Sequence, residues 1–321
     1  MRIIAIANQK GGCGKTTTAI NLSANLSEEN RKVLLIDMDP QGHASIGLNI
    51  RTEELKKTMF DLLVSDRRNP VSLDEIAIPI NENLDIAPSN ITLSAVEQVL
   101  SGIPGRDNKL LIKINSMKKS YDYIIIDCPP NIGILTFNAL RACREVVVPI
   151  EASFFSLHGL GKLFETIELF KETLNHEIFI RALPTIYDKR TRFSKEVLEE
   201  IQKYFKENTL KTIIHINVKL KEAASYGIPV NKYDRHSKGY FDYSRLAEEI
   251  IAMEEFRFLN YYKEMPVSDE QRESRPAISD FLTEDFKKER IPAEGKTDNR
   301  MRLVETVNTD TAVYNSVSIK K

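Results

Sequence analysis

Two lysines and three glycines lie within one short stretch that could hold a chain of phosphates. Residues 8–22 read NQKGGCGKTTTAINL. The segment Gly14-Lys15-Thr16 fits the end of the G-x-x-x-x-G-K-[ST] pattern of phosphate-binding loops, but Gln9 stands where the first glycine is expected. Glycines let successive backbone N–H groups turn inward as an anion nest, and the N-terminus of a following helix adds partial positive charge. The stretch therefore predicts a nucleotide-binding loop, in which Lys15 spans the β- and γ-phosphates and Thr16 ligates Mg²⁺.

Three aspartates follow apolar runs farther along the chain. Asp37 and Asp39 lie in LLIDMDPQG, and Asp127 lies in IIIDCPP. Burying an unpaired carboxylate is costly, so these residues are unusual as core, although each alone could instead cap a turn. In open α/β sheets, ligands bind at the carboxyl ends of the strands. Together with the phosphate loop, the three carboxylates predict a Mg²⁺ site and a means of positioning water for phosphoryl transfer.

Short apolar runs alternate with helical patterns along the chain. This alternation would form a sheet that brings the phosphate loop and the three aspartates to one edge. Most of the runs are continuous, which is typical of parallel strands covered on both faces. The alternation predicts an α/β fold with a doubly wound, mostly parallel sheet and helices on both faces. The expected strands are residues 2–7, 32–37, 84–89, 123–130, 145–152, 178–187 and 212–216. The expected helices are residues 16–27, 157–174 and 194–207, with a last helix from about residue 242 that docks through Tyr243, Leu246, Ala247, Ile250 and Ile251.

The composition narrows the class of protein. A chain of 321 residues suits one large α/β domain with an appendage. With 45 Lys plus Arg against 46 Asp plus Glu, the net charge of −1 gives no global attraction to DNA or lipid, so any polyanion must bind a local patch. The three cysteines, Cys13, Cys128 and Cys143, have no CxxC spacing, which argues against zinc and disulfides and fits a reducing cytoplasm. With no signal peptide and no run of about 18 apolar residues, we expect a cytoplasmic protein with no membrane partner.

The composition changes after about residue 262. From residue 264 to residue 321 there are 10 basic and 12 acidic residues, with few aromatics and no sustained period. Such a composition is typical of a solvated or disordered tail. We therefore expect a domain of residues 1–262 and a charged tail of residues 263–321.

Four segments carry a resemblance to a known family. They read KGGCGKTTTAINL, LLIDMDPQG, YDYIIIDCPPNIGILTFNAL and VVVPIEASFFSLHGL. Together they resemble the ParA/Soj family of partitioning ATPases, in the deviant Walker A group of P-loop proteins, from residue 1 to about residue 252. The resemblance implies an ATPase that uses ATP and Mg²⁺, forms a homodimer in its ATP state, binds DNA non-specifically and acts in chromosome or plasmid partitioning. It further implies slow intrinsic hydrolysis, a ParB-like stimulating partner and association with the nucleoid when ATP is bound.

The resemblance also implies roles for particular residues. Lys10 would reach across the homodimer to the partner's phosphates, so that pairing depends on the γ-phosphate. Asp39 would orient the attacking water, Asp37 and Asp127 would hold Mg²⁺ mostly through waters, and Asn217 would touch adenine. The candidate catalytic residues are Lys10, Lys15 and Asp39; the nucleotide-binding residues are Lys10, Gly11, Gly12, Cys13, Gly14, Lys15, Thr16, Thr17 and Asn217; and the metal-binding residues are Thr16, Asp37, Asp39 and Asp127.

A local surplus of positive charge occupies residues 189–238, with 12 Lys or Arg against 6 Asp or Glu. In the family, positions matching Arg190, Lys219 and Lys221 bind DNA without sequence preference, and such phosphate contacts add through counterion release. An ordinary solvated helix face is the alternative. The family reads close to IPRNVRLSEAPS where this chain has IHINVKLKEAAS, which leaves the adenine and DNA contacts of this segment open.

Two other functions stay open at this point. One is a nucleotide-switched scaffold that positions another cargo, bound by residues 263–321. The other is a membrane-associated positioning protein similar to MinD, which would require a basic amphipathic terminal helix. The stretch EEIIAMEEFRFLNYYKE is acidic and does not fit that requirement.

Overall fold

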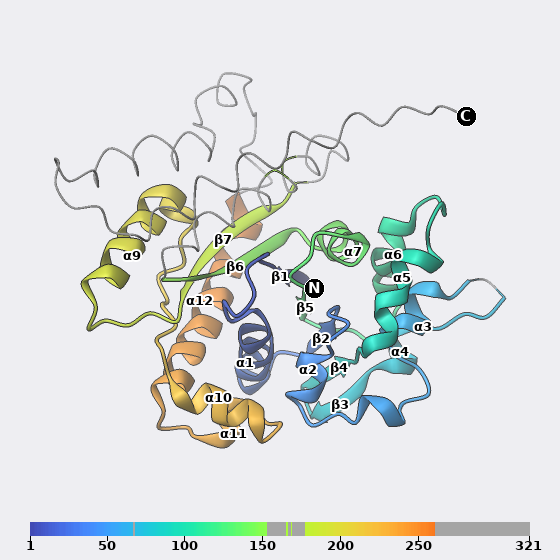
Figure 1. Ribbon diagram of the computed structural model, residues 1–321, viewed down its shortest axis with the longest axis horizontal. Coiled ribbons are helices and arrows are strands. Elements are labelled where there is room, and N and C mark those ends of the chain that lie inside the picture. Colours follow the sequence, from blue (N-terminus) through green and yellow to red (C-terminus); the bar gives the residue numbers. More distant parts are fainter. Residues whose placement is uncertain (67, 153–164, 166–167, 169–176, 261–321) are drawn as a thin grey trace, which may run out of the picture. The chain divides into compact units, whose positions relative to one another are not determined.

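Seven strands form a single sheet in the order β3-β4-β2-β5-β1-β6-β7 in the computed structural model of the protein (Figure 1). The structure describes residues 1–66, 68–152, 165, 168 and 177–260. All neighbouring strands pair in parallel except β3 and β4, which are antiparallel. The strands are β1 (Arg2–Ile6), β2 (Val33–Asp37), β3 (Ile78–Asn81), β4 (Leu84–Ala87), β5 (Tyr123–Asp127), β6 (Glu145–Glu151) and β7 (Phe179–Thr185). The doubly wound, mostly parallel α/β sheet expected from the sequence is therefore confirmed.

Helices cover both faces of the sheet, which is why the strands read as continuous apolar runs. Ile4 and Ile6 of β1 belong to a core shared with α1 and α12, whereas Ala5 points to the opposite face and is equally buried. The helices are α1 (Lys15–Glu28), α2 (His43–Ile46), α3 (Met59–Val64), α4 (Leu73–Ile76), α5 (Val96–Val99), α6 (Lys109–Asn115), α7 (Ile134–Ala142), α9 (Arg192–Phe205), α10 (Val218–Ser225), α11 (Val230–Tyr233) and α12 (Lys238–Asn260). Short 3-10 turns are η1 (Thr52–Glu54), η2 (Ile91–Ala95), η3 (Arg106–Asn108) and η5 (Lys206–Asn208).

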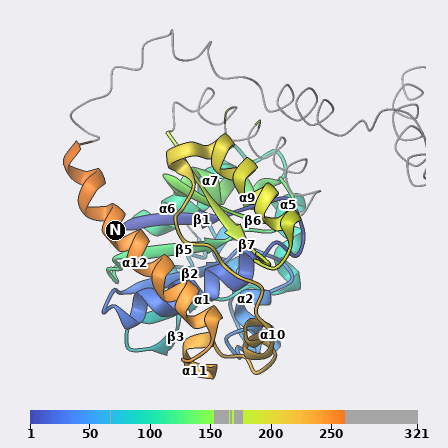
Figure 2. The same cartoon turned by 90° about the vertical axis from the view of Figure 1, so that its left-hand side faces the viewer.

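The last helix, α12, runs beside α1 (Figure 2) and begins four residues earlier than the sequence predicted. Its start is capped by Ser237, whose hydroxyl accepts a hydrogen bond from the backbone N–H of Tyr240 at 3.1 Å. The expected apolar face is confirmed, because Tyr243, Leu246, Ala247 and Ile250 are buried and Ile251 packs against the same core. The Tyr243 hydroxyl also lies 3.1 Å from that of Thr18, which ties α12 to the first turns of α1.

The strand predicted over residues 212–216 is wrong. This segment runs beside β7, where the N–H of Ile214 donates to the carbonyl of Pro184 at 2.9 Å, but only isolated bridges at Ala182–Thr209 and Tyr187–His215 form. Pro184 has no N–H with which to return a bond, and Ile186, with a φ of 52°, leaves the extended conformation, so the pairing is interrupted between the two bridges. The sequence also missed β3, a four-residue edge strand that contains a proline of its own.

Two expected features lie outside the described residues, apart from residues 165 and 168. They are the helix over residues 157–174 and the tail over residues 263–321. Within the described ranges, no helix combines the length and the apolar composition needed to cross a membrane.

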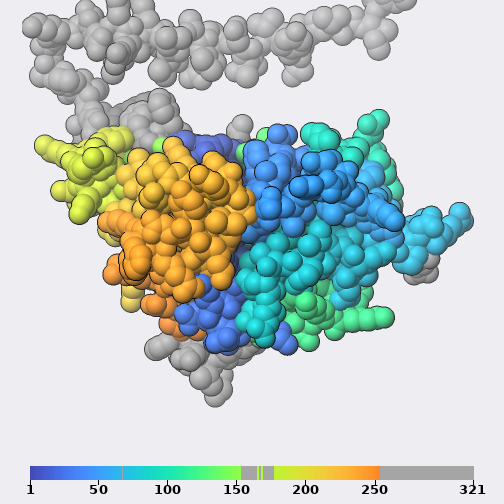
Figure 3. All heavy atoms as spheres, turned by 90° about the horizontal axis from the view of Figure 1, so that it is seen from below, coloured from blue at the N-terminus to red at the C-terminus, as the bar shows by residue number. Residues whose placement is uncertain are grey.

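The segment after α2 lies side by side with α10 and α11 on the face shown in Figure 3. A Cβ atom added at Gly227 would come within 2.9 Å of the Cβ of Asn49, so the two segments touch backbone to backbone. Gly227 also has a positive φ of 66°, a conformation that L side chains rarely adopt. This contact packs the turn after α10 against the segment that follows α2.

Candidate nucleotide and metal site

The loop between β1 and α1 has the backbone that the glycines predicted. Gly12 and Gly14 adopt φ angles of 74° and 94°, in the left-handed region, whereas Gly11 does not use that freedom. A Cβ at any of the three glycines would meet nothing within 4 Å, so open space lies over the loop. Gly14 is the N-cap of α1, and no side chain caps the helix there. The N–H groups of the first turn are thus available to an anion.

Lys15 folds back over this loop. Its Nζ donates to the carbonyl oxygen of Lys10 at 3.0 Å, and the residue is only 7 % exposed. The Cys13 thiol donates to the same oxygen at 3.2 Å, and the Thr185 hydroxyl donates to the carbonyl of Cys13 at 2.8 Å. Burial raises the pKa of Cys13, so the side chain is a neutral thiol that packs the loop onto β7. The lysine ammonium is therefore already inside the loop before a phosphate arrives.

Lys10 belongs to the same loop, and contacts within the chain hold both its backbone and its side chain. Its ammonium forms an ion pair with Glu151 at the end of β6. Its backbone N–H donates to the Asn8 side chain at 3.0 Å, and Asn8 in turn donates to the carbonyl of Pro149 at 2.7 Å. The loop is thus fastened to β6 through both the backbone and the side chain of Lys10.

Asp37 and Asp127 face each other across β2 and β5, where they are paired in register. The Oδ2 atom of Asp37 accepts from the Ser45 N–H at 2.9 Å and from the Ser45 hydroxyl at 2.7 Å. Its Oδ1 atom accepts from the N–H of Asp39 at 3.2 Å. Burial raises the pKa of Asp37 to about 6 against the lowering effect of these bonds, and the charge of Asp39 raises it further.

Asp127 has a different environment. Both carboxyl oxygens are buried and accept no hydrogen bond from any described residue. Burial raises the pKa of Asp127 well above its ordinary value, and the charge of Asp37 raises it further. The Thr16 hydroxyl and the Lys15 ammonium lower it, although Thr16 is not placed to donate a hydrogen bond of good geometry. A buried carboxylate without a partner is a costly arrangement that a bound cation would relieve.

Asp39 is rigidly placed beside this pair. Its Oδ1 atom accepts from the N–H of Gln41 at 2.9 Å, and its carbonyl accepts from the Ser89 hydroxyl at 2.7 Å. The N–H of Ser89 donates to the Ser45 hydroxyl at 3.0 Å, so one network joins the ends of β2 and β4 with the start of α2. The network holds the backbone of Asp39 and the carboxylate of Asp37 in one arrangement.

The residues present fit a hydrated magnesium ion better than a closed protein cage. No three His, Cys, Asp or Glu side chains of the described residues converge closely enough to bind a metal by themselves. Mg²⁺ usually keeps several waters and takes one or two carboxylates together with substrate phosphates. Thr16, half-buried in the first turn of α1, and the unpaired Asp127 are suited to that role.

The sequence missed the residues that hold this site in place. Asn8, Ser45, Ser89, Glu151 and Thr185 fix the loop and the carboxylates by the contacts described above. Ser89 could have been found from the sequence, because it is a polar residue just after the apolar run of β4. Asp37 and Asp127 stand at the same kind of position, at the ends of β2 and β5. The other residues of this set gave no such signal, since their partners lie up to 172 residues away in the chain.

Among the described residues, the side chain of Asn217 makes no hydrogen bond with the phosphate loop. It is the N-cap of α10, and its Oδ1 atom accepts from the N–H of Lys219 at 2.8 Å. Nearby, His215 lies 3.0 Å through Nδ1 from the buried Asp242 and packs edge-on against the ring of Tyr187. The altered family segment is therefore braced by a histidine and aspartate pair, and the adenine contact of Asn217 stays a prediction.

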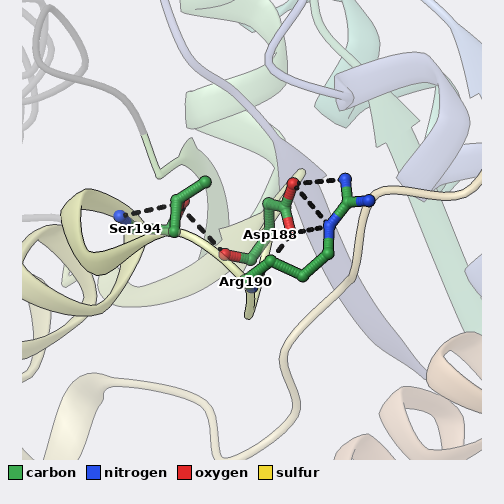
Figure 4. Close-up of polar contacts among 4 residues, drawn as sticks. Asp188, Arg190 and Ser194 are labelled. Carbon is green, nitrogen blue, oxygen red and sulfur yellow. Dashed lines mark hydrogen bonds and ion pairs between the residues drawn. The ribbon is translucent and has the colours of Figure 1, made fainter.

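Of the three predicted DNA-binding residues, Arg190 and Lys221 are exposed and Lys219 is half-buried. Arg190 and Lys219 are paired with acids. Arg190 makes a two-pronged contact with Asp188, with Nε–Oδ1 at 2.9 Å and Nη2–Oδ2 at 2.7 Å (Figure 4). This contact lowers the pKa of Asp188 to about 2. Lys219 pairs with Glu222 at 2.8 Å, whereas no acidic side chain in the described part of the chain lies within ion-pair distance of Lys221.

A phosphate loop between the first strand and helix of a parallel sheet, with aspartates at the ends of β2 and β5, defines the P-loop nucleotide-binding class. The sequence matches the AAA domain family (AAA_31) over residues 1–180. It is 43 % identical over 252 residues to the sporulation initiation inhibitor protein Soj of Bacillus subtilis, covering 78 % of this chain and 98 % of that protein. It is 40 % identical over 252 residues to the chromosome partitioning protein ParA of Myxococcus xanthus, covering 78 % and 88 %. The chain therefore belongs to this AAA domain family, among the Soj and ParA proteins.

Solved structures agree with this placement. Cobyrinic acid a,c-diamide synthase from Mycobacterium smegmatis, with bound ADP and magnesium, has a TM-score of 0.69 and 30 % identity, covering 83 % of this chain and 98 % of its own. A putative plasmid partition protein from Borrelia burgdorferi, bound to AMPPNP, has a TM-score of 0.66 and 30 % identity, covering 78 % and 99 %. Both neighbours bind adenine nucleotides, and the first holds magnesium with its nucleotide.

Proposed function

We propose that this chain is an ATP-hydrolysing dimerisation switch that acts in chromosome or plasmid partitioning. In this proposal it binds ATP with Mg²⁺, pairs with a second copy in the ATP state, and then binds DNA without sequence preference on the nucleoid. A ParB-like partner stimulates hydrolysis and releases the DNA. The identity to Soj and ParA and the nucleotide-bound structural neighbours support the proposal.

The observation that carries the proposal is the unpaired Asp127 beside the phosphate loop. Its two buried oxygens accept no hydrogen bond from the described residues, and Lys15 and Thr16 begin the helix that faces it. A protein that used this loop only as structure would gain nothing from a buried carboxylate without a partner. When bound, Mg²⁺ would neutralise charge that develops on the phosphates.

The side chains of the site have separable roles in this proposal. Lys15 exchanges the Lys10 carbonyl for phosphate oxygens, and the N–H groups of Gly12 to Thr16 bind the phosphates through the open face of the loop. Asp39, held by Gln41, orients the attacking water. An aspartate is a weak base at neutral pH, so hydrolysis is slow until a partner protein completes the site.

DNA binding and dimerisation are linked in this proposal. Lys10 supplies a cation to the phosphates of the second subunit, much as an arginine finger does. Pairing brings two basic surfaces together, each with Arg190, Lys219 and Lys221, and their phosphate contacts add. The chain keeps Arg190, Lys219 and Lys221 although the segment around His215 departs from the family.

Co-sedimentation with DNA of arbitrary sequence tests the proposal. The Asp39→Ala variant, which should retain unhydrolysed ATP, is compared with ATP and with ADP across a salt series. We expect retention on DNA with ATP only, falling steeply as salt rises. An ATP dimer that ignores DNA would instead favour the scaffold alternative, and binding that is equal with ATP and ADP would refute the switch.

A further inference from the structure

The ion pair between Lys10 and Glu151 joins the loop lysine to a carboxylate of its own chain. Glu151 is the last residue of β6, 141 residues from Lys10 in the chain, and the two side chains are 28 % and 24 % exposed, respectively. Both side chains therefore lie at the surface and border solvent at the carboxyl edge of the sheet.

The segments that carry this pair are firmly fixed. Asn8 holds the backbone N–H of Lys10 and is itself held by Pro149, two residues before Glu151. Glu151 is in register with Thr185 of β7, whose hydroxyl holds the loop at Cys13. The glutamate therefore cannot move away with the loop, and Lys10 must leave it to extend outward from the subunit.

We propose that Glu151 is an autoinhibitory partner of Lys10, which opposes the ATP-dependent pairing of two copies of this chain. The inference rests on the proposed function, in which Lys10 reaches the phosphates of the second subunit. Glu151 opposes the pairing of two copies in two ways. It competes with the partner's phosphates for the ammonium group, and its negative charge repels those phosphates.

The expected size follows from the symmetry of the dimer. Two identical subunits each break one Lys10–Glu151 pair, so the effects of the two pairs multiply. A partly exposed ion pair changes an equilibrium by about threefold. Removal of the glutamate charge should then lower the dissociation constant of the ATP-state dimer by about tenfold.

The experiment uses the full chain with AMPPNP and Mg²⁺, so that hydrolysis does not interfere. Sedimentation velocity over a range of protein concentrations gives the dimer dissociation constant of the wild type and of Glu151→Gln, with Glu151→Asp as the variant that keeps the charge. Glu75→Gln is the matched control, because Glu75 forms an ion pair with Lys57 elsewhere on the surface. We expect tighter pairing for Glu151→Gln, near wild-type pairing for Glu151→Asp, and no change for Glu75→Gln.

A second measurement examines the ion pair without any dimer. In nucleotide-free monomer, the rate at which a dilute acylating reagent modifies Lys10 is measured by peptide mass spectrometry, with the rate at Lys57 as the internal reference. Glu151→Gln should raise the rate at Lys10 several-fold and leave the rate at Lys57 unchanged. An unchanged rate at Lys10, or weaker pairing of Glu151→Gln, would overturn the inference. If the wild type does not pair with AMPPNP at any concentration, the proposed function fails, and the labelling rate still decides whether Glu151 restrains Lys10.

Discussion

At the carboxyl edge of the sheet, Lys15 is 7 % exposed and Asp127 is fully buried, and hydrogen bonds fix the segments that carry them. On the surface that carries Arg190, the arginine side chain is 79 % exposed and is paired with an acid two residues away. In the first region the buried carboxylate of Asp127 accepts no hydrogen bond from the described residues, whereas in the second the charge of Arg190 is paired with Asp188. Substitutions should therefore have large effects that depend little on salt in the first region, and small effects that depend strongly on salt in the second.

The largest effect should follow from Lys15→Ala. It removes the ammonium group that the loop already encloses, and charge-assisted bonds to phosphate are strong. We expect ATP affinity to fall by about a hundredfold or more, as measured by isothermal titration calorimetry with Mg²⁺ present. Lys32→Ala, an exposed lysine just before β2, is the control and should bind ATP normally. Retained ATP affinity in Lys15→Ala would mean that the loop is not the phosphate site.

Asp39→Ala should separate turnover from binding. The substitution leaves the Ser89 bond to the backbone of residue 39 in place, so the loop should keep its shape. We expect single-turnover ATP hydrolysis to slow by about a hundredfold, the scale of a lost general base or water-positioning group, with ATP affinity unchanged. Ordinary turnover in this variant would show that another residue orients the water.

Asp127→Asn should stabilise the protein when nucleotide and metal are absent. The substitution removes a buried charge without a partner, and the expected gain is about 2 kcal/mol in the free energy of unfolding. Asp85→Asn is the matched control, because Asp85 is also buried, at 4 % exposed, but is paired with Lys119 and accepts from Tyr121 at 2.5 Å. It should lose stability by a similar amount.

Chemical unfolding at pH 7.5 measures both changes. The same Asp127→Asn substitution should remove the extra stability that ATP and Mg²⁺ give to the wild type, which is a linkage effect of binding to the native state. Destabilisation by Asp127→Asn of the ligand-free protein would contradict the reading of Asp127 as an unpaired carboxylate.

The pH dependence of stability sharpens the same comparison. The pKa of Asp37 is raised to about 6 in the folded protein from an ordinary value of 3.8, and that of Asp127 is raised well above the same value. Between these values the native state holds protons that the unfolded state has lost, so stability falls as pH rises. The stabilising contribution of Asp37 is complete below about pH 4 and is lost as pH passes through about 6, and the contribution of Asp127 falls in the same direction as pH rises.

Urea unfolding of the wild type and of Asp127→Asn at pH 4.5, 5.5, 6.5 and 7.5 would show this. The stability advantage of the variant should grow with pH over this range, because the wild type must ionise its buried pair and the variant has only one acid left to ionise. If the stability advantage of the variant does not change with pH, the pKa of Asp127 is not raised in the folded protein.

The sequence predicted the fold well wherever burial on both faces dictates residue type. Ile4 and Ala5 face opposite sides of the sheet and are both buried, so β1 reads as an unbroken apolar run. The prediction failed at residues 212–216, where the composition of a strand is present but the neighbouring segment has a proline at Pro184 and a left-handed residue at Ile186, which interrupt the pairing. Local composition carries no information about the strand that a segment will lie beside.

The candidate site divides in the same way. The loop and the aspartates carry their chemistry in short patterns, so they could be found without a structure. The Lys10–Glu151 pair spans 141 residues, and the Ser45–Ser89 bond spans 44, so neither gives a spacing that a pattern could detect. The count of basic and acidic residues over 189–238 also does not show which lysines and arginines are already paired, as Arg190 is with Asp188 and Lys219 with Glu222.

The smallest effects should come from the Arg190 surface, and their signs should be opposite for the two members of the pair. Arg190→Ala should weaken DNA binding of the AMPPNP state by a few-fold and reduce the slope of log K against log salt by about 1 per subunit. Asp188→Asn should strengthen DNA binding, because DNA phosphates no longer compete with a carboxylate for the guanidinium group. Lys118→Ala is the control, because Lys118 is exposed and lies in the loop that leads into the amino end of β5. It should change neither the DNA affinity nor the salt slope. Fluorescence anisotropy with a labelled duplex at several salt concentrations measures all three variants. If Arg190→Ala and Asp188→Asn both weaken binding without a change in slope, the pair supports the loop after β7, and the DNA phosphates must be contacted elsewhere.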